Sequence, residues 1–132
     1  MFLLDTDTII YSLKGNDCVL RNLGNHQYDS LKISVITLME LYYGAYKSQK
    51  TNANLAKVRR IETAFDTISV DFFISETFGM IKSQLECQGT PLDDFDLIIA
   101  STALANNLIL VTNNEKHFRC VEGLKLDNWT QS

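Results

Sequence analysis

The sequence has little proline and no long apolar stretch. It contains one proline and six glycines among 132 residues, too few for an extended disordered linker. No apolar run approaches the length of a membrane-spanning helix. The first run, at residues 2–4, is also too short for a signal peptide and has no basic residues before it. We therefore expect a single domain over residues 1–132, located in the cytoplasm and without a membrane partner.

Cysteine is also scarce, and the balance of charge is acidic. The three cysteines, Cys18, Cys87 and Cys120, are widely spaced, so they form neither a zinc-binding pattern nor a disulfide framework. A net charge of −4 argues against a protein that binds nucleic acid over its whole surface. It does not exclude a metal site for phosphate groups, because a bound cation brings positive charge of its own.

Short apolar runs alternate with helical patterns along the chain. We expect strands at residues 2–4, 31–35, 67–70, 108–111 and 124–126. Glycines such as Gly15, Gly24 and Gly89 are typical helix stops between them. This alternation predicts an α/β fold with a central, mostly parallel sheet that is covered by helices on both faces.

Asp5 directly follows the first expected strand. Ligands of open α/β sheets bind beyond the carboxyl ends of the strands, which is where Asp5 would lie. An equally valid interpretation is that Asp5 or Thr6 caps the next helix.

Glu40 also allows two interpretations. Thr37 and Glu40 have the spacing of a capping box, in which Glu40 would bond only to backbone N–H groups. Alternatively, the helix begins near Ser34 or Val35 and Glu40 projects from its second turn. A carboxylate on so apolar a helix is costly unless it has a partner, which favours the second interpretation.

Three carboxylates open the helix expected after Pro91. The helix dipole favours acidic residues in a first turn, and this accounts for Asp93 or Asp94. Asp96, however, shares a helix face with Ala100 and Ala103. Because small residues suit close packing against a sheet, we expect Asp96 to point inward.

A basic stretch occupies residues 47–60, with a helix that Thr51 or Asn52 can cap. Its charged side chains are Lys47, Lys50, Lys57, Arg59 and Arg60. They form either a solvated helix face or a patch that follows the phosphates of a nucleic acid.

Crossovers in a parallel sheet bring several of these groups to one edge. Asp5, Glu40 and Asp96 would meet there, beside Thr112 and Asn114, which follow the fourth expected strand. Clustered carboxylates raise one another's pKa unless a cation neutralises them. With hard oxygen ligands that cation would be Mg²⁺ or Mn²⁺, and such a site suits phosphodiester hydrolysis.

The chain resembles PIN-domain nucleases, and more closely the VapC-type ribonuclease toxins of bacterial type II toxin–antitoxin pairs. The resemblance is carried by Leu3-Leu4-Asp5-Thr6-Asp7, by Ser34-Val35-Ile36-Thr37-Leu38-Met39-Glu40-Leu41-x-x-Gly44, by Gly89-x-Pro91-x-x-x-Phe95-Asp96-x-x-Ile99-Ala100, and by Val111-Thr112-Asn113-Asn114-x-x-x-Phe118. It implies an α/β/α sandwich, Mg²⁺ or Mn²⁺ as cofactor, RNA as substrate, a homodimer, and silencing by a VapB-type antitoxin.

The resemblance also implies roles for particular residues. It matches Asp5, Glu40 and Asp96 to the acidic triad, and so favours the second interpretation of Glu40. The further residues of the shell would be Thr6, Asp94, Thr112, Asn114 and His117. The basic residues expected to contact RNA are Lys47, Lys50, Arg59 and Arg60.

The chain departs from this family at the fourth acid. Many members carry it at the position of Asn114 or just before the phenylalanine that is Phe118 here. This chain has Asn114 and His117 at those positions. A neutral imidazole binds Mn²⁺ better than Mg²⁺, so we expect a preference for Mn²⁺ if His117 reaches the site. If His117 points to solvent, Asn114 alone completes the shell.

Two other classes remain open from the residues alone. The opening motif also fits haloacid-dehalogenase-type phosphatases, in which Asp5 would be the nucleophile and Asp7 an acid/base. The acidic pair Asp93-Asp94, however, leads into a helix instead of following a strand. The other class is a catalytically silent interaction module, against which the complete triad argues.

Overall fold

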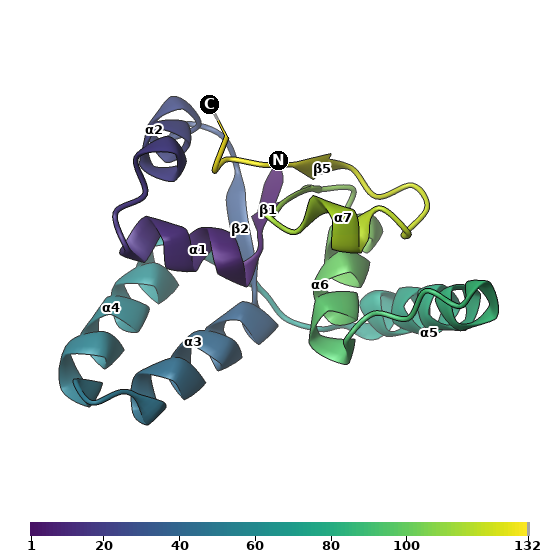
Figure 1. Ribbon diagram of the computed structural model, residues 1–132, viewed down its shortest axis with the longest axis horizontal. Helices are drawn as coiled ribbons and strands as arrows, with labels where there is room; N and C mark the ends of the chain where they lie inside the picture. Colours follow the sequence, from purple (N-terminus) through teal and green to yellow (C-terminus); the bar gives the residue numbers. More distant parts are fainter. Residues whose placement is uncertain (132) are drawn as a thin grey trace.

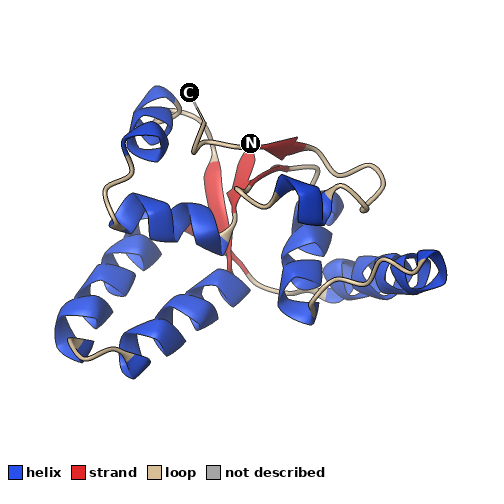
Figure 2. Ribbon diagram, viewed as in Figure 1, coloured by secondary structure: helices blue, strands red, loops and turns tan. Residues whose placement is uncertain are grey.

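The computed structural model describes residues 1–131, which contain a five-stranded sheet. Its strands are β1 (Phe2–Leu4), β2 (Leu31–Ser34), β3 (Asp66–Ile68), β4 (Ile109–Val111) and β5 (Leu126–Asp127). They lie in the order β3-β2-β1-β4-β5, and every neighbouring pair is parallel (Figure 2). The predicted α/β fold with a parallel sheet is confirmed.

Helices follow most of the strands. They are α1 (Thr6–Leu13), α2 (Asp17–Asn25), α3 (Val35–Lys47), α4 (Thr51–Ala64), α5 (Phe72–Gln88), α6 (Asp94–Ala105) and α7 (Glu115–Phe118). Figure 1 shows α1 to α4 on one side of the strands and α5 to α7 on the other. Among the described residues, no helix combines the length and the apolar character that a membrane crossing requires.

The two faces of the sheet bury different apolar clusters. Successive side chains of a strand point to opposite faces, so Leu3 and Leu4, both fully buried, enter different clusters. Leu3 packs with residues of α5 and α6, such as Ile81 and Leu97. Leu4 packs with residues of α1 to α4, such as Ile9. The result is the three-layer α/β/α arrangement that the resemblance implied.

The strand order places a switch point beside β1. From β1 the chain moves outward to β2 and β3, and then returns to the opposite side of β1 for β4 and β5. Phe2 of β1 consequently pairs with both Leu31 and Ile109. Crevices at such a reversal, beyond the carboxyl ends of the strands, are the usual ligand sites of open parallel sheets.

Abrupt strand-to-helix turns bring helix N-termini to this edge. Strand β2 ends at Ser34, and α3 begins at the next residue. The Ser34 hydroxyl accepts a hydrogen bond from the Ile36 N–H (3.1 Å), so Ser34 is the N-cap of α3. Helix α3 contacts both α1 and α6. These turns fix the positions of Asp5, between β1 and α1, and of Glu40 on α3.

Some predicted boundaries were wrong. The third strand lies at Asp66–Ile68 instead of 67–70, and the last at Leu126–Asp127 instead of 124–126. Helix α4 has Lys50 as its N-cap without a side-chain hydrogen bond. Thr51 is instead the first helical residue, and its hydroxyl donates to the Ser48 carbonyl (3.0 Å). The predicted glycine stop at Gly89 is confirmed, since this residue is left-handed at φ 72°.

Candidate active site

Asp5 lies at the carboxyl end of the central strand and is only 5% exposed. One carboxylate oxygen accepts a hydrogen bond from the Thr6 N–H, and the other accepts one from the Thr112 hydroxyl, both at 2.8 Å. Asp5 therefore caps α1 and also joins β1 to the end of β4. Asp5 can therefore be both a helix cap and a residue of a ligand site at the strand end, because the cap uses only one of its two oxygens.

Asp7 belongs to the same site, although the sequence indicated it only for the phosphatase alternative. Its Oδ2 accepts from the Asn113 N–H (3.0 Å) and lies 3.4 Å from the Thr112 hydroxyl. Thr112 is fully buried and also accepts a hydrogen bond from the Asn114 N–H (3.0 Å). The exit from β4 is thus held by two carboxylates of the β1–α1 segment. The spacing of Asp5 and Asp7 by two residues was the available signal.

Glu40 projects from the second turn of α3 toward Asp5's neighbour Thr6. The Thr6 hydroxyl donates to Glu40 Oε1 at 2.7 Å and lies 3.0 Å from the hydroxyl of the fully buried Thr37. Because Ser34 is the N-cap, the capping-box interpretation of Thr37 and Glu40 is wrong. The partner that the apolar helix required for its carboxylate is Thr6.

Asp96 lies in the first turn of α6, where its Oδ2 is 3.1 Å from His117 Nε2 of α7. His117 therefore does not point freely into solvent. Asp93 is the N-cap of α6 and accepts from the Phe95 N–H. Asp94 is largely exposed and accepts a hydrogen bond from Lys82 of α5 at 3.0 Å. The structure thus places Asp94 toward α5 instead of in the shell where we expected it.

The carboxyl groups of the site all have raised pKa values; they belong to Asp5, Asp7, Glu40 and Asp96. Burial, and next the charge of Asp7, raise the pKa of Asp5 from 3.8 to about 7. Burial is also the largest cause of the raised pKa of Asp7. Burial, followed by the charge of Asp96, raises the pKa of Glu40 against the opposing hydrogen bond from Thr6. For Asp96, burial and the charge of Asp93 outweigh the lowering effect of His117 on its pKa.

These groups suit a divalent cation by charge and by donor type. Within residues 1–131, no ion pair joins Asp5, Asp7 or Glu40 to a lysine or arginine. No three His, Cys, Asp or Glu side chains of that part of the chain are already gathered closely enough to hold one ion. Binding would therefore require side-chain rotation. Oxygen donors of this kind are the ligands that Mg²⁺ and Mn²⁺ prefer.

Two hollows adjoin Glu40, and Ile10 and Glu40 line both of them. The larger, of about 600 Å³, is lined by Thr6, Ile10, Met39, Glu40, Tyr43 and Phe95. The second, of about 370 Å³, lies between α1, α3 and α4, and its rim includes Lys14 and Lys57. We call these two hollows together the apolar groove. It gives a bound molecule access to Glu40.

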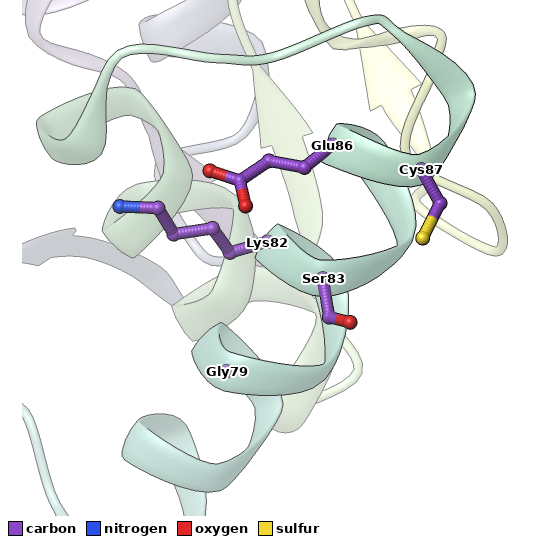
Figure 3. A pocket seen from close by; sticks show the side chains of 5 residues that line it. All are labelled: Gly79, Lys82, Ser83, Glu86 and Cys87. Carbon is purple, nitrogen blue, oxygen red and sulfur yellow. The ribbon is translucent and has the colours of Figure 1, made fainter.

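A third hollow, of about 500 Å³, belongs to α5 alone. Figure 3 shows Lys82 and Glu86 on one side of the helix and Ser83 and Cys87 on the other. It contains none of the predicted site residues. A hollow lined by side chains of one helix is a surface depression. The candidate site therefore consists of the carboxylates of Asp5, Glu40 and Asp96 with the apolar groove that Glu40 lines.

The basic residues 47–60 do not lie together at the carboxylates. Lys47, Lys50, Arg59 and Arg60 are exposed on α3, α4 and the turn between them. The Lys47 ammonium lies 5.6 Å above the Tyr43 ring. Only Lys57 of the stretch lines the apolar groove, together with Lys14, the C-cap of α1, which we did not predict. Lys14 is isolated in the sequence and gave no signal.

Comparison with known proteins agrees with this geometry. A family model described as PIN domain matches residues 2–124. The chain is 37% identical over 129 residues to the tRNA(fMet)-specific endonuclease VapC of Shigella flexneri, covering 98% of both chains. It is 33% identical to Ribonuclease VapC2 of Haemophilus influenzae (strain Rd), covering 97% of both.

Solved structures give the same result. The structure of VapBC2 from Rickettsia felis bound to a promoter DNA fragment superimposes with a TM-score of 0.92 at 34% identity, covering 97% of this chain and 98% of that one. DNA-bound VapBC from Salmonella typhimurium gives 0.92 at 33% identity, covering 97% of both chains. The chain belongs to the PIN-domain family and, within it, to the VapC-type ribonucleases. This membership excludes the alternative that the chain is a haloacid-dehalogenase-type phosphatase.

The raised pKa of Asp5 predicts a pH-dependent stability in the metal-free protein. Because the folded-state pKa lies above the unfolded one, this group favours folding most below pH 4, and its contribution is lost as pH rises to about 7. Asp5→Asn keeps the size of the side chain and one oxygen that can accept from the Thr6 N–H, and it removes the charge. At pH 7 in EDTA it should be more stable than wild type by at least about 1 kcal/mol, and the difference should shrink toward pH 4.

Urea unfolding between pH 4 and 8 measures this difference. The matched control is Asp66→Asn, which removes a largely exposed carboxylate on the edge strand β3. Surface pairs of that kind contribute little, so the control should follow the wild-type curve. A constant difference between Asp5→Asn and wild type at all pH values would contradict the assignment.

Proposed function

We propose that the protein is an endoribonuclease that hydrolyses phosphodiester bonds of RNA with Mg²⁺ or Mn²⁺, and that it acts in the cytoplasm as the toxin of a type II toxin–antitoxin pair. The observation that carries this proposal is electrostatic: Asp5, Glu40 and Asp96 come from three separate elements, and burial and, in addition, the charge of Asp96 raise the pKa of both Asp5 and Glu40. Neither Asp5 nor Glu40 has a lysine or arginine partner in the described residues. The membership in the VapC-type ribonucleases supports the reaction.

In this proposal the carboxylates of Asp5, Glu40 and Asp96 hold the cation. When bound, the cation positions the phosphate, offsets its charge and acidifies water for attack on phosphorus. The protein supplies preorganisation: Thr112 fixes one oxygen of Asp5, and Thr6 fixes one oxygen of Glu40. Burial keeps competing water away from these hydrogen bonds, which strengthens the electrostatic interactions at the site.

We propose a transfer RNA as the substrate. Two relatives, from Shigella flexneri and Salmonella typhimurium, are named tRNA(fMet)-specific endonucleases, at 37% and 35% identity. The acidic net charge of this chain makes local positive charge necessary for an RNA site. Lys14 and Lys57 provide it at the rim of the apolar groove, close to Glu40. Arg59 and Arg60 would extend this path along α4.

We propose a VapB-type antitoxin as partner and the apolar groove as its binding surface. Structures of relatives at 34% and 33% identity are named as VapBC. The groove exposes Met39, Tyr43 and Phe95 beside Glu40. An apolar segment in a groove is a common mode of peptide recognition, and a cation on that segment could pair with the carboxylates. Occupation of the groove would exclude RNA.

A homodimer is also part of the proposal. Phe72 and Phe73 at the start of α5 are 96% and 66% exposed. With the nearby exposed Val70 they form an apolar surface of a kind that marks protein interfaces. This surface lies outside the residues that line the apolar groove, so a second copy of the chain could occupy it without blocking the carboxylates.

The first test concerns catalysis. Asp5→Asn and Asp96→Asn should each lower cleavage of tRNA(fMet) by at least about 100-fold, because each removes a preorganised charged group. EDTA should abolish cleavage, and Mg²⁺ or Mn²⁺ should restore it. Glu86→Gln, an exposed change on α5, is the control and should retain wild-type rates. Full activity in EDTA contradicts the mechanism, and an inactive wild-type protein would indicate the silent interaction module.

The second test concerns the RNA path. Changing both Lys14 and Lys57 to alanine should flatten the dependence of log K on log[salt] by roughly 1.4, because two phosphate contacts to a single strand are lost. The same measurement on the pair Lys47 and Lys50 tests the other part of the basic stretch. An unchanged slope would show that the altered pair makes no phosphate contacts and belongs to a solvated helix face.

The third test concerns the antitoxin. Expression of the protein in a bacterium should arrest growth, expression of Asp5→Asn should not, and a VapB-type antitoxin from the neighbouring gene should restore growth. Tyr43→Glu should weaken antitoxin binding at least about 10-fold, because aromatic anchors dominate such interfaces. Tyr28→Glu is the control, since Tyr28 is 94% exposed outside the groove. Equal affinity of the two variants would place the antitoxin elsewhere.

A further inference from the structure

His117 is held against the site by the buried end of its own helix. Its backbone N–H donates to the Asn114 carbonyl at 2.9 Å. The next residue, Phe118, is fully buried and contacts the imidazole edge-on, with ring centroids 5.7 Å apart. The imidazole side chain itself is 40% exposed. The His117 imidazole is therefore oriented toward Asp96 and remains partly exposed to solvent.

The distance between His117 and Asp96 matches the spacing of two neighbouring ligand atoms around one metal ion. Ligands of a small divalent cation lie about 2.1 Å from it at the corners of an octahedron, so adjacent ligand atoms are about 3 Å apart. His117 Nε2 and Asp96 Oδ2 are 3.1 Å apart. In the metal-free protein this distance is a hydrogen bond. With an ion on Asp96, the same separation suits two donors to that ion.

The chemical identity of this donor is the unusual feature. Asp5, Asp7, Glu40 and Asp96 offer only oxygen, which both Mg²⁺ and Mn²⁺ accept. His117 offers the site's imidazole nitrogen. Imidazole suits transition metals, whereas Mg²⁺ keeps oxygen ligands and water. One nitrogen in an oxygen shell therefore discriminates between the two ions without changing the number of donors.

We propose that His117 is the specificity-determining residue of the cation site and gives it a preference for Mn²⁺ over Mg²⁺. This inference rests on the proposed function, because it requires a cation that Asp96 helps to hold. His117 acts as a ligand of the ion, so its removal weakens Mn²⁺ binding more than Mg²⁺ binding. A carboxylate at this position reduces the preference, since oxygen serves both ions.

Calorimetric titration of metal-free protein with MnCl₂ and with MgCl₂, at one pH and ionic strength, tests the proposal. Wild type should bind Mn²⁺ at least about 10-fold more tightly than Mg²⁺. His117→Glu should lower this ratio about 10-fold, and His117→Ala should weaken Mn²⁺ binding by about 10-fold or more. Lys116→Gln is the control: it changes net charge by the same amount one residue away and should keep the wild-type ratio.

Pulsed electron paramagnetic resonance of bound Mn²⁺ gives a readout that does not depend on affinity. Wild type should show coupling to an imidazole nitrogen, and His117→Glu should not. The signal is unambiguous, because the second histidine, His26, stacks on Trp129 next to Phe2, at the amino end of β1.

The possible failures are separable. Absence of binding of either ion to wild type overturns the cation site and, with it, this inference. Binding of both ions with an unchanged ratio in His117→Glu, or without nitrogen coupling, overturns the role of His117 alone and leaves the ribonuclease proposal intact.

Discussion

The site depends on the bonding of one buried carboxylate, that of Asp5. Its two oxygens connect the first turn of α1 to the end of β4, through Thr6 and Thr112. Because β4 lies on the opposite side of β1 from β2, these bonds join the two halves of the sheet at its switch point. The carboxylate is destabilised by burial and by its neighbours, yet it satisfies both donors and also carries a negative charge.

Keeping several carboxylates charged in one partly buried site has opposite effects on stability and on function. Charged groups that repel one another in a partly buried place lower stability, and the protein offsets this with hydrogen bonds from threonine hydroxyls and backbone N–H groups. Neutral donors fix the directions of the carboxylates without removing their charge. A lysine paired with these carboxylates would neutralise their charge, and the site would then attract a metal cation less strongly. The repulsion among the carboxylates therefore lowers the stability of the metal-free protein and favours the binding of a cation.

Much of the fold and part of the site could be predicted from the sequence. Apolar runs marked the strands, and Asp5 at a strand end and Glu40 on an apolar helix indicated a site. Boundaries such as that of β3 were less accurate, since apolar character continues through Val70 while the hydrogen-bonded ladder ends at Ile68. Contacts between distant segments, as between Asp7 and Asn113, depend on strand order. No local pattern could reveal them.

The strand order has a consequence for synthesis of the protein. Asp5 and Glu40 belong to the first third of the chain, whereas Asp96, Thr112 and His117 belong to the last, and β4 must insert beside β1 to bring them together. A nascent chain leaves the ribosome in order from its first residue. Until β4 has emerged, the oxygen of Asp5 that Thr112 binds has no partner and the site is incomplete. The site is therefore completed only after β4 has been synthesised and has paired with β1.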